Sequence, residues 1–270
     1  MSISPSRSSR DVIALLASIA EGGLVTVAAA ATALGVTRVS ASKRLAALAR
    51  SGWLTPVRRG LFSIRPLEAT ADTPLADEDP WVLASRAFAP CYIGGWSAAG
   101  HWGLTEQLFR VTLVVAERPV RRSRAQLGSS EFLVVRERRV AQTGLVTIWR
   151  RNARVLVSSV ERTLMDACAN PHWVGGGGQL AAIFHAAVRD DRVAPAAMLR
   201  EASASPSGAA RGRLGVLAEH YWPSAEALIE YAHAHRGSGK VRFDPAVADR
   251  GKFVGRWGMW VNVRLPEDST

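Results

Sequence analysis

The chain of 270 residues is poor in cysteine, in lysine and in long hydrophobic runs. Its two cysteines, Cys91 and Cys168, match no metal-ligand or redox spacing, so we expect both to be buried free thiols. The longest apolar stretch, residues 24–36, is too short to span a bilayer, and residues 1–10 lack the apolar core of a signal peptide. These absences predict a cytoplasmic protein without membrane contacts.

Side chains able to bind a cofactor or a metal are also scarce. The six histidines show no zinc-site spacing. The glycine-rich stretches at 175–178 and 237–239 lack the Lys-Ser/Thr pair of a phosphate-binding loop. We therefore expect neither a cofactor nor a metal.

Two carboxylates, Glu161 and Asp166, are the strongest candidates for a catalytic pair. A nuclease could use them to hold Mg²⁺, but their separation by five residues places them on different faces of a helix. We predict structural roles instead, with Glu161 in a capping box with Ser158 and Asp166 in an ion pair with Arg162. We expect no enzyme activity, and a DNA-targeted nuclease stays open as an alternative.

Positive charge is what the sequence has in excess. The formal net charge is +11, and of the 34 basic residues only three are lysines. Residues 1–66 hold 9 basic and 2 acidic side chains, and residues 81–155 hold 12 and 4. Residues 67–80 between them hold five acidic side chains and no basic one. Two basic blocks separated by a short acidic stretch predict a polyanionic partner.

The first basic block shows the pattern of three helices followed by a β-hairpin. The predicted helices cover residues 9–21, 25–34 and 37–51, and the predicted hairpin covers residues 53–64. Thr37 is placed to cap the third helix, and Gly35 permits a tight turn before it. This order of elements is typical of a winged helix-turn-helix domain.

The third predicted helix has one apolar face and one basic face. Ala41, Leu45 and Leu48 would pack on the domain, which leaves the other face free for a major groove. The predicted DNA contacts of this recognition helix are Arg38, Ser40, Lys43 and Arg44. At the wing, Arg58 and Arg59 would lie on the phosphate backbone or in the minor groove. Because winged helices also dock proteins, a protein-docking adaptor is a second alternative.

Composition divides the chain into two domains of an α+β fold. We expect the winged helix-turn-helix domain at 1–66, an acidic linker at 67–80 and a larger mixed α/β domain at 81–270. The second domain carries two arginine clusters at strand ends or in loops, where they can face a partner. Their members are Arg118, Arg121, Arg122, Arg124, Arg136, Arg138 and Arg139.

Four segments of the second domain carry motifs in a recognisable order. They are YIGGWSAAGHWGLTEQ (92–107), VLVSSVERTLMDA (155–167), GRLGVLAE (212–219) and WGMWVNV (257–263). Together with the predicted winged helix, they resemble the AbiEi antitoxins of type IV toxin–antitoxin and abortive-infection systems. The resemblance covers most of the chain.

The resemblance implies a transcriptional repressor and antitoxin with a role in phage defence. Its first domain would bind double-stranded DNA at inverted repeats in its own promoter. The sequence leaves the oligomeric state open, and a monomer in solution that binds cooperatively on DNA is compatible with it. Its second domain would support that binding and counter a nucleotidyltransferase toxin, with which the family need not form a stable complex. The arginine clusters of the second domain would then meet phosphates or the toxin.

Overall fold

The computed structural model describes residues 8–64, 79–120, 122–137 and 143–266. The chain forms two compact units. Unit 1 contains residues Met1–Cys91, Ala116–Arg138 and Thr147–Leu156, and unit 2 contains residues Tyr92–Val115, Arg139–Val146 and Val157–Thr270. The predicted linker lies outside the described residues except for its last two, so the predicted domain boundaries stay a prediction.

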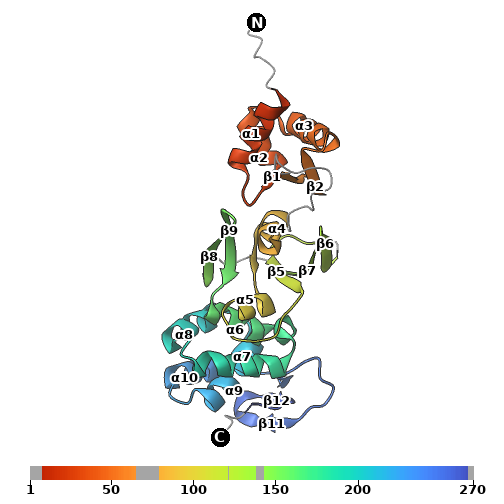
Figure 1. Ribbon diagram of the computed structural model, residues 1–270. Helices are drawn as coiled ribbons and strands as arrows, with labels where there is room; N and C mark the ends of the chain where they lie inside the picture. The colour runs from red at the N-terminus through yellow and green to blue at the C-terminus, as the bar shows by residue number, and fades with distance from the viewer. Residues whose placement is uncertain (1–7, 65–78, 121, 138–142, 267–270) are drawn as a thin grey trace. The chain divides into compact units, whose positions relative to one another are not determined.

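Unit 1 begins with three helices and three strands (Figure 1). They are α1 (Ser9–Ile19), β1 (Leu24–Thr26), α2 (Val27–Leu34), α3 (Arg38–Arg50), β2 (Leu54–Arg58) and β3 (Leu61–Ile64). The three predicted helices and the predicted β2–β3 hairpin are confirmed. Strand β1 was not predicted. It pairs antiparallel with β3, and α2 begins after it because Thr26 accepts a hydrogen bond from the Ala29 N–H at 3.1 Å.

Small side chains let these helices pack closely. Ala30 of α2 and Ala41 of α3 are fully buried, together with Leu16 and Leu45. Gly35 ends α2 in the left-handed conformation, with φ at 65°, which allows the tight turn into α3. The sequence prediction of this turn is confirmed.

The rest of unit 1 adds α4 (Pro80–Ala87), β6 (Arg124–Leu127) and β7 (Ser130–Arg136). Asp79 caps α4 by accepting hydrogen bonds from the N–H groups of Trp81 at 2.9 Å and Val82 at 3.3 Å. The same carboxylate pairs with Arg150 Nε at 2.7 Å. These bonds fix where α4 begins.

A six-stranded sheet has the strand order β6-β7-β5-β4-β9-β8. Its remaining strands are β4 (Cys91–Ile93), β5 (Val111–Ala116), β8 (Leu145–Arg150) and β9 (Ala153–Ser158). β6 and β7 are antiparallel, and β4 and β9 are parallel. The expected combination of helices and sheets is confirmed.

Unit 2 is mainly helical (Figure 1). Its helices are α5 (Gly95–His101), α6 (Val160–Ala169), α7 (Gly177–Arg189), α8 (Pro195–Ala204), α9 (Gly208–Tyr221) and α10 (Glu226–Ala234), with short 3₁₀ turns at Pro171–Val174 and Gly255–Trp257. A small sheet joins β10 (Val241–Arg242), β12 (Met259–Val261) and β11 (Lys252–Val254) in that order. Leu164, Phe184, Leu217 and Trp257 lie in the buried core of this unit.

A buried arginine ties α9 to the neighbouring segments of unit 2. Arg213 donates to the carbonyl oxygens of Phe243 at 2.7 Å, Cys168 at 2.8 Å and Arg242 at 3.0 Å. The Cys168 carbonyl belongs to the last turn of α6, where a helix lacks internal donors. Arg213 therefore has a structural role in the core.

Candidate nucleic-acid interface

The first turn of α3 is fixed by a side-chain cap. Thr37 Oγ1 accepts a hydrogen bond from the Ser40 N–H at 3.2 Å, and the Thr37 hydroxyl donates to Ser40 Oγ at 3.1 Å. On one face of the helix Ala41, Leu45 and Leu48 are buried, so α3 cannot rotate without exposing them. The opposite face is therefore held outward.

All four residues predicted on the recognition helix are exposed, namely Arg38, Ser40, Lys43 and Arg44. Within the described part of the chain, the side chains of the three basic residues make no hydrogen bond or ion pair. Ser40 differs, because its hydroxyl already accepts the hydrogen bond from Thr37. Three cationic side chains are thus available to an external anion, and their contact with DNA stays a prediction.

Two residues that we did not predict lie at the centre of this outward face. At about 100° per residue, Val39, Lys43 and Arg50 point most directly away from the buried stripe. Val39 is 66% exposed, and it is the only large apolar residue of α1–β3 whose side chain is exposed. A helical projection of the sequence would have found both Val39 and Arg50.

The β2–β3 hairpin turns at Arg59 and Gly60. Gly60 has a φ of 82°, a conformation that favours glycine, and its carbonyl accepts a hydrogen bond from the Val27 N–H at 3.0 Å. Arg59 is exposed and makes no hydrogen bond or ion pair with any residue that the structure describes. Within unit 1, the turn therefore presents Arg59 as a free cation.

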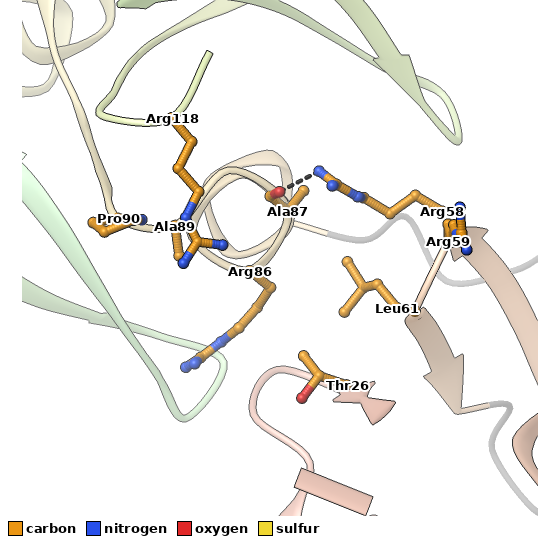
Figure 2. Close-up of a pocket in the computed structure, with 10 residues that line it drawn as sticks. Thr26, Arg58, Arg59, Leu61, Arg86, Ala87, Ala89, Pro90 and Arg118 are labelled. Atoms are coloured by element: carbon orange, nitrogen blue, oxygen red, sulfur yellow. Dashed lines mark hydrogen bonds between the residues drawn. The ribbon is translucent and has the colours of Figure 1, made fainter. Parts of the chain in front are cut away.

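Arg58 lies next to Arg59 but is engaged by the chain itself. It donates a hydrogen bond to the Ala87 carbonyl at the end of α4 (Figure 2). Its guanidinium also lies 5.8 Å from the centre of the Phe88 ring. The two predicted wing residues are therefore not equivalent. Arg58 connects the hairpin to α4, whereas Arg59 is free.

Four further predicted arginines lie in unit 1, and all four are exposed: Arg118, Arg122, Arg124 and Arg136. Three others, Arg121, Arg138 and Arg139, lie outside the described residues. Arg118 is the one that the fold brings beside the hairpin, where it lines the same hollow as Arg58 and Arg59 (Figure 2). The hollow measures about 480 Å³ and is also lined by Arg86, which we did not predict.

The carboxylates considered for catalysis are held by structural hydrogen bonds. Asp166 accepts from the Tyr92 hydroxyl and from Arg162 Nε, both at 2.7 Å, and all three residues are buried. The predicted ion pair of Arg162 with Asp166 is confirmed.

The predicted capping box on Ser158 is wrong by one residue. The cap of α6 is Ser159, whose hydroxyl accepts from the Arg162 N–H at 3.2 Å and donates to Glu161 Oε2 at 3.0 Å. Ser158 is the last residue of β9, and its buried hydroxyl bonds with Thr163 Oγ1 at 2.7 Å. The end of β9, which the sequence did not place exactly, decides which serine caps the helix.

The described residues contain no group of three or more His, Cys, Asp or Glu side chains arranged to hold a metal ion. None of the helices in this part of the chain combines the length and apolar character needed to cross a membrane.

One family comparison falls on the helices and the hairpin just described. Residues 14–65 match the model of the family described as "Transcriptional regulator, AbiEi antitoxin". The predicted AbiEi resemblance is confirmed over this segment. The AbiEi match includes α3 and the hairpin, whereas the four motifs of the second domain lie outside it. No curated protein matches the chain.

The fold also occurs in a solved structure, the crystal structure of the RV2827C protein from Mycobacterium tuberculosis. The two chains are 20% identical, with a TM-score of 0.59 over 93% of this chain and 89% of that chain. At this identity the likeness shows the fold alone.

Proposed function

We propose that this chain is the DNA-binding repressor and antitoxin of a type IV toxin–antitoxin operon. In this proposal α1–β3 act as a winged helix-turn-helix that binds inverted repeats in the chain's own promoter. The observation that carries the proposal is the outward face of α3, which is basic, unpaired and held in place by a buried apolar stripe. It lies inside the segment that matches a family of transcriptional regulators.

In the proposed complex, α3 enters the major groove and the hairpin follows the backbone. Lys43 and Arg44 contact phosphates or guanine edges, and Arg59 contacts a phosphate beside the groove. Arg38, at the first turn, contacts the groove wall. Phosphate contacts position the protein, and base contacts supply the sequence preference.

The antitoxin part of the proposal rests on the family description. We propose that residues 81–270 carry the action against a nucleotidyltransferase toxin, without catalysis, cofactor or metal. The proposal places the protein in the cytoplasm, where the operon DNA lies. Co-expression with a nucleotidyltransferase gene from the same operon should restore growth, and continued growth arrest would contradict the antitoxin role.

A plasmid assay tests the nuclease alternative. A supercoiled plasmid should stay intact when it is incubated with the protein and Mg²⁺, and cleavage of the plasmid would favour a nuclease.

Fluorescence anisotropy tests the DNA-binding part directly. The purified full chain is titrated with its upstream promoter duplex and with a shuffled duplex of equal length, over a series of salt concentrations. We expect promoter affinity to exceed shuffled affinity by at least ~10³. Equal and weak binding to both duplexes would contradict a sequence-specific repressor. Absence of salt-sensitive binding would favour a protein-docking adaptor.

A paired substitution tests which residues meet the phosphates. Replacing Lys43 and Arg44 by Ala should reduce the slope of log affinity against log salt by about two units, because two phosphate contacts are lost. The matched control replaces Arg192 and Arg200, two exposed arginines of unit 2, and should leave the slope unchanged. An unchanged slope in the Lys43 and Arg44 variant would exclude both residues from contact with phosphates.

A further inference from the structure

The hollow beside the β2–β3 turn is lined by arginines from three separate segments. Arg58 and Arg59 come from the hairpin, Arg86 comes from α4, and Arg118 follows β5. None of the residues that line the hollow is acidic. Its volume of about 480 Å³ is in the range of small-molecule sites. A cleft lined by one sign of charge concentrates ligands of the opposite sign.

Backbone contacts hold these segments in place. The Gly60 carbonyl accepts from the Val27 N–H at 3.0 Å, which fixes the hairpin turn against the start of α2. The Glu117 N–H donates to the Pro90 carbonyl at 3.0 Å, which fixes the position of the chain just before Arg118. Each side of the hollow is therefore fixed by backbone, and two side-chain contacts join the sides, the hydrogen bond of Arg58 to the Ala87 carbonyl and the pair of Arg86 with Glu21.

The four guanidinium groups have different amounts of free donor capacity. Arg59 and Arg118 are exposed and have no hydrogen bond or ion pair among the described residues. Arg58 donates to the Ala87 carbonyl, and Arg86 pairs with Glu21. The Nε of Arg86 is buried without a hydrogen-bond partner in the described part of the chain. Several N–H donors thus remain for an anion.

The arrangement of these groups indicates the shape of the anion. All four arginines line the hollow, and Figure 2 shows that their guanidinium groups lie apart and do not converge on one point. Arg58 runs from the hairpin to Ala87, whereas Arg86 runs away from the hairpin, so their guanidinium groups lie apart. A single phosphate would meet one or two of them. A chain of linked phosphates could meet guanidinium groups on several sides.

We propose that this hollow binds a small anion with linked phosphates, the chemistry that nucleoside polyphosphates and inorganic polyphosphate share. We further propose that such an anion competes with DNA for Arg59. This second step rests on the proposed DNA-binding function. A guanidinium already bound to a phosphate cannot release counterions from DNA, so an occupied hollow should weaken DNA binding. The backbone of DNA offers the same phosphate chemistry, and the two arms of the test separate these sources.

The first arm needs no DNA. Tripolyphosphate is titrated into the full chain by calorimetry at constant ionic strength. We expect one tripolyphosphate to bind to each chain. Arg118→Gln should weaken it about tenfold, because charge-assisted hydrogen bonds are lost. The matched control is Arg124→Gln, an exposed arginine on β6 of the same unit that does not line the hollow, and it should bind as the unchanged chain does. Equal weakening in both variants, or no saturable binding, would overturn the proposal of a free-anion site.

The second arm measures promoter binding by anisotropy with added tripolyphosphate, against sulfate at equal ionic strength. Tripolyphosphate should inhibit more than sulfate, and Arg118→Gln should remove the difference. If calorimetry shows no binding but Arg118→Gln alone lowers the salt slope by about one unit, the hollow holds DNA backbone, and the free-anion proposal fails. If the chain does not prefer its promoter but tripolyphosphate still binds, the proposed function fails and the anion site stands.

Discussion

At the scale of single residues, Val39 combines an apolar side chain with an exposed position. It lies one residue into α3, between Arg38 and Ser40, and is 66% exposed. A β-branched residue gains little from such a place in a free helix, because its side chain loses rotamer freedom without being buried. In the major groove, the methyl group of thymine offers the apolar contact that Val39 lacks.

The first prediction is that Val39 contacts a thymine methyl group of the operator. Replacing that thymine by deoxyuridine removes the methyl and should weaken binding about fourfold, the worth of one buried methyl group. Val39→Ala should weaken binding to the natural operator by a similar factor. The affinity of this variant should not change when the contacted thymine is replaced by deoxyuridine. Anisotropy with operators that carry one deoxyuridine at a time measures the coupling. Equal losses for both proteins at every thymine would contradict the contact, even if promoter binding itself is specific.

Asp166 shows the opposite case, a charged residue inside unit 2. It is bonded to Tyr92 and Arg162, and removing one partner of a buried ion pair leaves the other charge uncompensated. The second prediction is that Asp166→Ala lowers the free energy of unfolding by about 3–5 kcal/mol. Tyr92→Phe removes a hydroxyl that donates to Asp166 and accepts from Arg162 Nη2 at 3.4 Å, and it should cost about 1–3 kcal/mol.

Urea denaturation measures both changes. The matched control is Asp190→Ala, which removes the exposed pair with Arg189 and should leave the midpoint unchanged. A loss for Asp166→Ala no larger than that of the control would show that the buried pair is not a structural element.

At the scale of secondary structure, α9 depends on a glycine where two elements meet. A Cβ added to Gly215 would overlap the six-membered ring of Trp257, which is buried and donates from Nε1 to Glu219 Oε2 at 2.6 Å. The ring therefore lies directly on the backbone of α9. Helix propensity alone would favour alanine at this position.

The third prediction compares two glycines on helices of unit 2. Gly215→Ala should lower the free energy of unfolding by about 1–3 kcal/mol, because the ring of Trp257 must move. Gly178→Ala, at a helical position of α7 with no heavy atom within 4 Å of the added Cβ, should raise it by about 0.4–1 kcal/mol. Thermal unfolding of both variants measures the difference. Two changes of the same sign would contradict the close contact.

At the scale of the whole molecule, the two thiols report on each compact unit. Cys91 belongs to unit 1 and Cys168 to unit 2, and both are buried free thiols, as predicted. Burial raises the pKa of each thiol from 9.0 to about 12. Neither thiol forms the reactive thiolate near neutral pH while its unit is folded.

The fourth prediction concerns thiol reactivity and alkaline stability. At pH 8, iodoacetamide should label Cys91 and Cys168 only through opening of their units, and both should react at once in urea. Above pH 9 the thiols ionise in the unfolded chain but stay protonated in the folded chain. The contribution of the two thiols to the free energy of unfolding should therefore fall from pH 9 to about pH 12. Mass spectrometry of labelled peptides follows each thiol separately. Rapid labelling of either cysteine in the folded chain would contradict the burial.

The local sequence determined the helices and the hairpin of α1–β3. Thr37 and Gly35 specify the start of α3 and the turn before it through short-range hydrogen bonds and backbone conformation. The periodic spacing of Ala41, Leu45 and Leu48 determines which face of α3 is buried. These features depend on neighbours a few residues away, so the sequence alone predicts them. The AbiEi resemblance came from four motifs of the second domain together with the predicted winged helix, and the family comparison confirmed it over residues 14–65, which contain none of the four motifs.

Only the tertiary structure decided how the basic residues are used. Arg58 and Arg59 are adjacent and identical in type, but one is bonded to the carbonyl of Ala87 and the other is free. Arg86 and Arg118 join them around one hollow, although Arg118 lies about sixty residues beyond the hairpin. Contacts between distant segments depend on how the elements pack, and neither periodicity nor local charge encodes that packing. The sequence therefore determined the elements of this protein and the sign of its charge, and the fold determined which charges remain available to a partner.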